Sequence, residues 1–186
     1  MNLTLAKTFA RPVQNMPEYL AFLEFCETYF RNRGIEHPIV VEIGIQSNLQ
    51  KRFYEELLGA EHIGIDCSNQ YSVPDILGNS HHDTTLAALK EKLNGRSVNL
   101  LFIDNGEIRY ESIAQDYAMY GPLVSDLIAF HNTAIMNPAW GACRLWRELQ
   151  VRESRRFMFI EFYRHIPEGE QFHATQMGIG VMVRQA

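Results

Sequence analysis

The segment IVVEIGIQSN, residues 39–48, is an apolar run that breaks off at an acid, a glycine and a group of polar residues. This order predicts a buried strand followed by a tight turn. Ser47 and Gln50 have the spacing of a capping box, and apolar residues then recur at helical spacing, so we expect a helix from Ser47 to Gly59. A strand, a glycine turn and a helix N-terminus together form a corner that can bind a ligand.

Strand and helix patterns alternate through the rest of the chain. The expected helices are those after the N-cap residues Asn15 and Asp83, the one through 113–120 and the one from Pro138 onward. The expected strands are 62–65, a weak one around 76–77, 98–103, 127–130, and a final pair at 157–163 and 179–183. This alternation predicts an α/β fold with a doubly wound, mainly parallel seven-stranded sheet and an antiparallel edge hairpin at the C-terminus.

The composition is that of a soluble globular protein, with 46% hydrophobic and 21% charged residues among 186. We therefore expect one domain over residues 1–186, in which residues 1–37 form an N-terminal segment and a covering helix. Lys7 and Arg11 interrupt the apolar start and no stretch is long enough to span a bilayer, so we expect a cytoplasmic protein without a membrane partner. A formal charge of −5 argues against a nucleic-acid partner. Three cysteines without metal-ligand spacing fit small buried side chains in a reducing compartment: Cys26, Cys67 and Cys143.

Polar residues follow the expected strands at the points where the apolar runs end. They are Glu42 and Gly44 after the first strand, Asp66 after the second, Asn79 and Ser80 after the third, Asp104 after the fourth, and His131 and Asn132 after the fifth. Because the carboxyl ends of parallel strands meet at one edge of a sheet, we expect Glu42, Asp66, Asp104 and His131 to converge on one crevice. Cys26 and Trp146 lie on apolar helix faces and should pack away from it.

The separation between the glycine turn and Asp66 favours an adenosine-type cofactor. An acid about twenty residues beyond such a turn is placed to bind the hydroxyls of a ribose. A dinucleotide would also need small residues beside its pyrophosphate, yet Gln46 and Asn48 stand there. S-adenosylmethionine (SAM) has a ribose and an adenine but no phosphate, so this turn suits it better than a nicotinamide dinucleotide.

Several short blocks resemble the class I SAM-dependent methyltransferases, in order and in spacing. The blocks are 41–44 (VEIG), 63–66 (IGID), 78–80 (GNS), 102–106 (FIDNG), 120–123 (YGPL), 128–132 (IAFHN), 145–149 (LWREL) and 178–181 (GIGV). The nearest branch contains cephalosporin-hydroxylase-like proteins and small metal-dependent O-methyltransferases. The resemblance implies a Rossmann-like methyltransferase fold from about residue 39 to the C-terminus.

The same resemblance implies roles for individual residues. By position, the methionine end of SAM would be held by Glu42, Gly44 and Ile45, the ribose by Asp66, and the adenine by Asn79 and Ser80. Asp104 would either orient the SAM amine or, with His131 and Asn132, fall at the positions that carry a divalent metal. The sequence departs from the branch at Glu107, where His is usual, at His131, where an acid is usual, and near Asn48, where a glycine is usual.

Two mechanisms stay open at this point. Asp104, His131 and Asn132 could bind Mg²⁺ or Mn²⁺ through a carboxylate, an imidazole and an amide oxygen. Without a metal, His131 would be the general base, since histidine side chains titrate near neutral pH. We expect a SAM-dependent O-methyltransferase with catalytic residues Asp104 and His131, acting on a small-molecule or sugar-like acceptor, and count a homo-oligomer among its expected states. The alternative is a methyltransferase-like domain that has lost catalysis and serves as a binding or assembly module.

Overall fold

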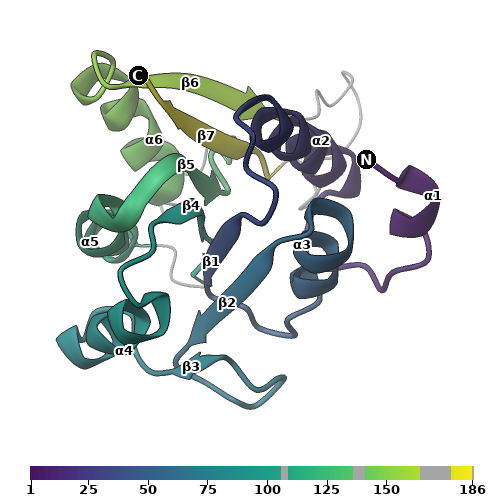
Figure 1. The fold of residues 1–186 in the computed structure, drawn as a ribbon. Coiled ribbons are helices and arrows are strands. Elements are labelled where there is room, and N and C mark those ends of the chain that lie inside the picture. The colour runs from purple at the N-terminus through teal and green to yellow at the C-terminus, as the bar shows by residue number, and fades with distance from the viewer. Residues whose placement is uncertain (106–108, 136–140, 164–176, 186) are drawn as a thin grey trace.

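The computed structural model of the protein describes residues 1–105, 109–135, 141–163 and 177–185 (Figure 1). Within these residues the strands form one seven-stranded sheet in the order β3-β2-β1-β4-β5-β7-β6. The strands are β1 (Ile39–Ile43), β2 (Glu61–Asp66), β3 (Ile76–Leu77), β4 (Val98–Ile103), β5 (Val124–His131), β6 (Phe157–Phe162) and β7 (Ile179–Arg184). All strands expected from the sequence are present.

The direction of the strands confirms the expected fold class. β1 is parallel to β2 and β4, and β3 and β5 continue the parallel arrangement on either side. β7 is antiparallel to both β5 and β6. The C-terminal hairpin therefore lies at one edge of the sheet, with its second strand inside and β6 outermost.

Helices cover both faces of the sheet, as a doubly wound fold requires (Figure 1). One face is covered by α2 (Met16–Asn32) and α3 (Gln50–Leu58), beside the short α1 (Leu3–Ala6), and the other by α4 (Asp83–Leu93), α5 (Tyr110–Tyr120) and α6 (Gly141–Arg152). A single turn of 3₁₀-helix, Gly121–Leu123, leads into β5. Side chains alternate between the faces, so Val41 packs in one core and Val40 in the other.

The helix ends agree with the sequence in part. Asn15 caps α2 by accepting a hydrogen bond from the Glu18 backbone N–H, and Gly59 ends α3 at a φ of 64°. The expected capping box of Ser47 is wrong. α3 begins at Gln50, and no side chain among the described residues caps it. Residues 45–48 instead form a tight turn in which Asn48 N–H donates to the Ile45 carbonyl, so the chain is still turning where the helix was expected.

The N-terminus of α4 and that of α6 were expected at Asp83 and Pro138. His82, not Asp83, stands at the N-cap position of α4, and Asp83 lies in the first turn, where an acid favours the helix dipole. Pro138 lies outside the described residues, as does Glu107. Of the three cysteines only Cys26 is fully buried, whereas Cys67 is exposed in the loop after β2, so the expectation of buried thiols is wrong for Cys67.

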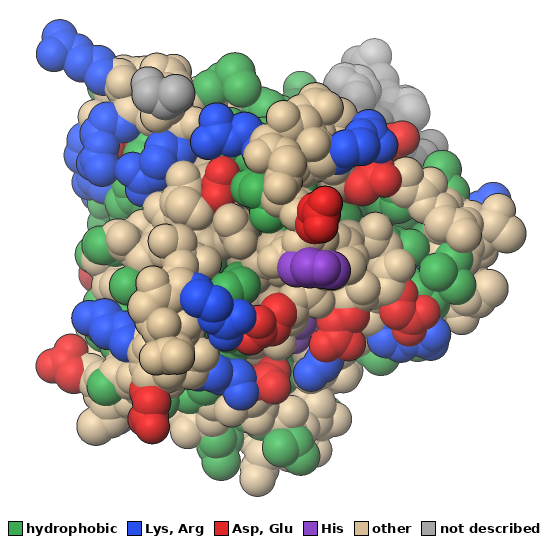
Figure 2. All heavy atoms as spheres, in the orientation of Figure 1, with side chains coloured by type: hydrophobic (Ala, Val, Ile, Leu, Met, Phe, Trp, Pro, Cys, Tyr) green, Lys and Arg blue, Asp and Glu red, His purple; other side chains and the backbone are tan. Residues whose placement is uncertain are grey.

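The surface carries both signs of charge in close mixture. On the face shown in Figure 2, Lys and Arg side chains gather most densely at the upper left, where Figure 1 places α6 and β6. Acids accompany these cations, because Arg147 of α6 pairs with Glu161 of β6, and Arg156 pairs with Glu153 in the turn between the two elements. No helix in the described part of the chain is long and apolar enough to cross a membrane.

Candidate active site

A cavity of about 680 Å³ opens at the carboxyl ends of β1, β2, β4 and β5. Its lining includes eight of the nine site residues expected from the sequence, namely Gly44, Ile45, Asp66, Asn79, Ser80, Asp104, His131 and Asn132. Cys26 and Trp146 are fully buried in the two cores, as expected. The parallel strands thus bring residues from five separate segments to one crevice.

The turn after β1 keeps a glycine-like backbone although two of the expected glycines are absent. Gly44 has a φ of 87°, and a Cβ there would lie 2.3 Å from the Asp104 carbonyl oxygen, so only glycine fits. Gln46 and Asn48 also adopt left-handed φ values of 45° and 53°. Such values cost a non-glycine residue roughly 1 to 2 kcal/mol. Asn tolerates this conformation better than Gln does, so the tertiary structure imposes the turn chiefly on Gln46.

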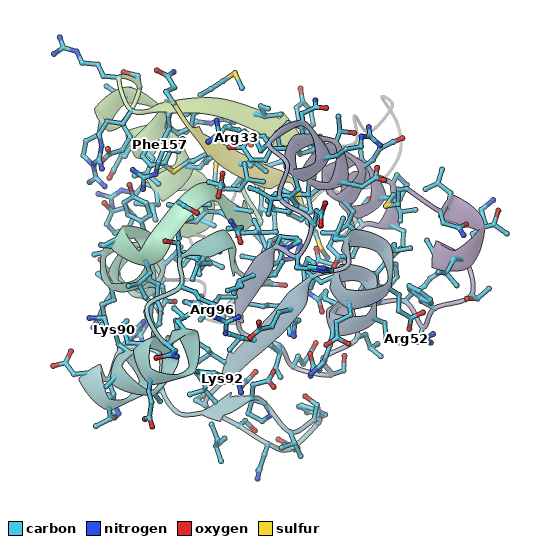
Figure 3. All side chains as sticks on the ribbon, in the orientation of Figure 1. Arg33, Arg52, Lys90, Lys92, Arg96 and Phe157 are labelled. Atoms are coloured by element: carbon cyan, nitrogen blue, oxygen red, sulfur yellow. The ribbon has the colours of Figure 1, made fainter. Side chains whose placement is uncertain are left out.

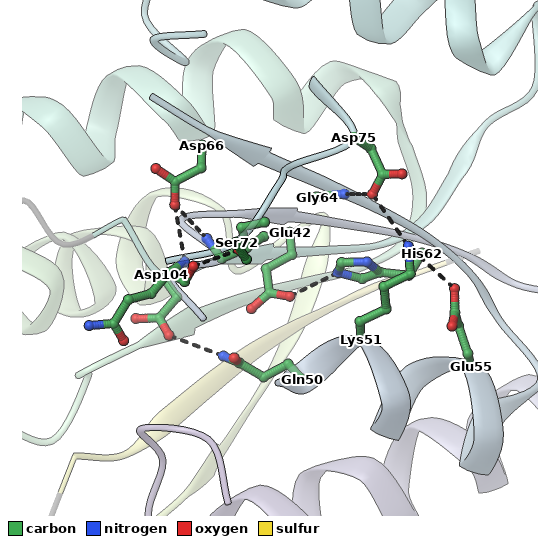
Figure 4. A network of polar contacts seen from close by, with 12 residues as sticks. Glu42, Gln50, Lys51, Glu55, His62, Gly64, Asp66, Ser72, Asp75 and Asp104 are labelled. Carbon is green, nitrogen blue, oxygen red and sulfur yellow. Dashed lines mark hydrogen bonds and ion pairs between the residues drawn. The ribbon is translucent and has the colours of Figure 1, made fainter. Parts of the chain in front are cut away.

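Asp66 ties this turn to the end of β2. Its Oδ2 accepts hydrogen bonds from the backbone N–H groups of Ile45 at 3.1 Å and Gln46 at 3.0 Å (Figure 4). Its Oδ1 accepts one from Ser68 N–H at 2.9 Å. An ionised carboxylate has about four acceptor positions, so Oδ1 retains capacity for a hydroxyl in the cavity.

Glu42 is the expected site residue that the cavity leaves out. It lies inside β1, and the alternation of side chains turns it toward the face that α2 and α3 cover. There its Oε2 lies 2.9 Å from His62 Nε2, and both side chains are completely buried (Figure 4). Burial raises the pKa of the Glu42 carboxyl, with the hydrogen bond from His62 opposing the shift. Within the described residues Glu42 does not line the cavity, so its expected convergence with Asp66, Asp104 and His131 is wrong.

Asp104 and His131 form a hydrogen-bonded pair in the cavity wall. Asp104 Oδ1 lies 2.7 Å from His131 Nδ1, and the imidazole stacks on Phe102 with the ring centroids 6.3 Å apart. A carboxylate can only accept at this contact, so the neutral form of the imidazole carries its proton on Nδ1 and has its lone pair on Nε2. Nε2 is buried and has no hydrogen-bond partner among the described residues. A basic nitrogen without a partner in the described part of the chain therefore belongs to a side chain of the cavity wall.

The same contacts bear on the divalent metal. A 2.7 Å separation between Asp104 and His131 is a hydrogen-bond distance, and the other Asp104 oxygen accepts from Gln14 Nε2 at 2.7 Å. Asn132 lies beside them in a turn with a φ of 67°. In the described part of the chain no group of three or more His, Cys, Asp or Glu side chains could hold a metal. The donor atoms therefore fit a hydrogen-bonded pair better than a metal-ligand set.

Another part of the cavity lining belongs to a polar cluster that follows β3. Asn79 and Ser80 follow β3, and Tyr120 donates to the Ser80 carbonyl at 2.8 Å. His81 lines the cavity, with its Nε2 3.5 Å from Asp116 Oδ1. Asp116 also accepts from Asn105 Nδ2, and burial raises the pKa of its carboxyl. These contacts give the expected adenine end a rigid polar wall.

Sequence reasoning missed several residues that line the cavity or touch its acids. They are Val13, Gln14, Gln50, Arg109, Ser112 and Met177. Gln50 Nε2 approaches Asp104 Oδ2 at 3.5 Å from the first turn of α3 (Figure 4). Val13 and Gln14 come from the segment between α1 and α2, which is far in sequence from the end of any strand. No local pattern marks such residues, because their place depends on packing between distant segments.

No protein-family model matches the sequence, and no curated protein matches it either. Solved structures match in fold. An O-methyltransferase from Bacillus cereus in complex with S-adenosylhomocysteine (SAH) has a TM-score of 0.58 and 14% identity over 89% of this chain and 81% of its own. The magnesium protoporphyrin IX methyltransferase from Synechocystis PCC 6803 with bound SAM has a TM-score of 0.53 and 12% identity over 90% and 80%. A plantazolicin methyltransferase in complex with SAH has a TM-score of 0.55 and 11% identity over 92% and 85%.

At these identities the likeness is one of fold. The chain has the Rossmann-like fold of the class I SAM-dependent methyltransferases, as the resemblance in the sequence implied.

Proposed function

We propose that residues 1–186 act as one SAM-dependent methyltransferase domain that methylates an oxygen of a small-molecule or sugar-like acceptor. The observation that carries the proposal is that His131, whose Nε2 has no hydrogen-bond partner among the described residues, lines a cavity that also holds the Gly44 turn and Asp66. The solved structures of the same fold that contain SAM or SAH support the choice of cofactor.

The lining fits SAM by its chemistry. We assign the methionine end to the turn at Gly44 and Ile45. A side chain at position 44 would clash with the Asp104 carbonyl oxygen, so the turn can pack against β4 only with glycine there. Asp66 keeps an acceptor position for a ribose hydroxyl. Asn79 and Ser80 bound the end that we assign to adenine. When bound, SAM would supply a methyl group on a positively charged sulfur. SAH is the leaving group once the methyl group has passed to the acceptor.

Asp104 and His131 would supply the proton chemistry. The acceptor hydroxyl gives its proton to His131 Nε2 as its oxygen forms the bond to the methyl carbon. Asp104 stabilises the resulting imidazolium through Nδ1, because the two groups already share a hydrogen bond. The rest of the wall orients the acceptor, since methyl transfer is an in-line displacement that depends on alignment. The proposal contains no step that uses a metal.

The test is calorimetric titration with SAM and SAH, followed by methyl transfer to catechol, sugar and hydroxy-acid acceptors with and without chelator. We expect micromolar or tighter SAH binding, an affinity of about −8 kcal/mol, and methyl transfer that chelator leaves unchanged. Loss of transfer with chelator and its return with Mn²⁺ or Mg²⁺ would replace the metal-free mechanism. SAH binding without transfer to any acceptor would favour a binding module, and no SAH binding would reject the proposal.

A further inference from the structure

Gln14 reaches the candidate active site from the N-terminal segment. Its Nε2 donates to Asp104 Oδ2 at 2.7 Å, although 90 positions separate the two residues. The neighbouring Val13 lines the cavity, whereas Gln14 lies half-buried behind it. The contact is as short as the one between Asp104 and His131. A hydrogen bond to an ionised carboxylate at this distance is among the stronger kinds in proteins.

The segment that carries Gln14 is packed on the helices of the domain. Phe9 is only 6% exposed, and its ring meets the Phe53 ring of α3 edge to face at 4.9 Å. The guanidinium of Arg52, which Figure 3 labels on α3, lies 4.3 Å from the centre of the Phe9 ring. Gln14 is followed directly by Asn15, the cap of α2. Both ends of this short stretch are therefore anchored, and they hold the Gln14 amide against Asp104.

The two short contacts on Asp104 divide its oxygens. Oδ1 meets His131 Nδ1 and Oδ2 meets Gln14 Nε2, while Gln50 Nε2 is a longer neighbour of Oδ2 at 3.5 Å. Two donors at opposite oxygens restrain the rotation of the carboxylate about its terminal bond. That restraint keeps Oδ1 in place to hold the proton on Nδ1 and so keeps Nε2 free of a proton.

We propose that Gln14 is a positioning residue for the Asp104–His131 pair. It acts through Asp104 and fixes the tautomer of His131 that can take a proton from the acceptor. The inference rests on the proposed function for its effect on the rate. Its effect on the tautomer is independent of any acceptor.

The experiment compares Gln14→Met, Gln14→Glu and Thr8→Ala with the wild type. Gln14→Met keeps the size of the side chain and removes the donor, and Gln14→Glu keeps the shape and places a second carboxylate beside Asp104. Thr8→Ala is the matched control, because Thr8 donates from the same segment to the Leu5 carbonyl, away from the cavity. Nitrogen-15 NMR of the histidine rings in ligand-free protein measures the tautomer of His131. Steady-state kinetics with the best acceptor measure kcat, the KM for SAM and the pH profile.

In the wild type and in Thr8→Ala we expect His131 with its proton on Nδ1. Gln14→Met should populate both tautomers and lower kcat roughly 10- to 100-fold, the effect of losing one hydrogen bond to a charged group, with little change in the KM for SAM. Gln14→Glu should move the acidic limb of the rate profile to higher pH, because a second negative charge favours the protonated imidazole. A purely structural role for Gln14 would leave the single Nδ1–H tautomer of His131 unchanged in Gln14→Met.

A single Nδ1–H tautomer together with an unchanged rate and pH profile in both Gln14 variants would overturn the inference. If Gln14→Met does not fold, the isosteric Gln14→Glu decides by its tautomer and pH profile. A tautomer change in the variants without methyl transfer by the wild type would support the positioning contact and reject the proposed function. An equal loss of methyl transfer in the Gln14 variants and in Thr8→Ala would support the proposed function and reject the positioning contact.

Discussion

Two acid–histidine pairs lie in neighbouring regions of the same sheet face, and their surroundings differ. Asp104 and His131 are 2.7 Å apart at the strand ends, with side chains 17% and 5% exposed, and both line the cavity. Glu42 and His62 are 2.9 Å apart inside β1 and β2, and both are completely buried. The chemical groups are the same in the two pairs. Their distance from the end of the strand decides which pair a ligand can reach.

The buried pair is enclosed by aromatic side chains. The Tyr54 ring stacks on the His62 ring at 5.4 Å, and Tyr19 meets Tyr54 edge to face at 6.3 Å. Burial also raises the pKa of both tyrosine hydroxyls. We propose that this buried pair contributes to stability, whereas the pair at the strand ends carries the chemistry of the proposed function. The predictions below test that division, from the largest expected effect to the smallest.

His131→Ala removes the proposed base of the pair at the strand ends. We expect methyl transfer to fall roughly 10²- to 10⁴-fold, the usual contribution of a general base, while SAH still binds. Initial rates at saturating SAM and calorimetric titration with SAH measure the two effects. A variant that retains its rate within a few-fold would leave positioning of the acceptor as the source of catalysis.

His62→Ala removes the partner of the buried pair. It leaves the Glu42 carboxylate buried without its hydrogen bond and should lower the free energy of unfolding by about 3 to 5 kcal/mol at pH 7. Urea unfolding measures the change, and His37→Ala, at an exposed position, is the control that should stay within about 0.5 kcal/mol. Equal stability of the two variants would show that the buried pair is not a stabilising contact.

Asp66→Ala removes a carboxylate that lines the cavity. Unlike the acids of the two pairs, Asp66 accepts hydrogen bonds from backbone N–H groups and not from a histidine. We expect SAM binding to weaken by about 1 to 3 kcal/mol, or roughly 5- to 150-fold in Kd. Asp75→Ala is a matched control, because Asp75 also accepts a backbone N–H, from Gly64 of β2, but is not among the described residues that line the cavity. An equal loss in both variants would mean that loop stability, and not ribose binding, explains the effect.

Glu42→Gln removes the titrating carboxyl of the buried pair. Because the folded-state pKa of Glu42 is raised above 4.5, the folded protein holds this proton more tightly than the unfolded chain. Its stabilising contribution is full below pH 4.5 and is lost as the pH rises through the folded-state pKa. Relative to Glu42→Gln, the wild type should lose stability in that window by up to about 1.4 kcal/mol per pH unit.

Unfolding free energies of both proteins between pH 4 and 8 measure this difference. Subtracting the two curves cancels the contribution of Asp116, whose pKa burial also raises. A difference that stays flat with pH would mean that Glu42 titrates alike in the folded and unfolded states.

Patterns within one segment predicted most of the fold. The apolar run 98–103 is buried on both sides and became the central strand β4, and Gly59 and Asn94 end their helices in left-handed conformations. The capping box at Ser47 failed because the turn after β1 extends to Asn48. A local motif cannot show how far a turn continues when distant residues, here Asp66, hold its backbone.

By itself the sequence determined the alternation of strands and helices and the placement of Asp66, Asp104 and His131 at strand ends. These depend on periodicity and on steric limits of the backbone, which are local. Only the tertiary structure decided that Glu42 turns into the core toward His62 and that Gln14 reaches Asp104. Such contacts join residues 20 and 90 positions apart, so they follow from the packing of helices on the sheet, which no short segment encodes.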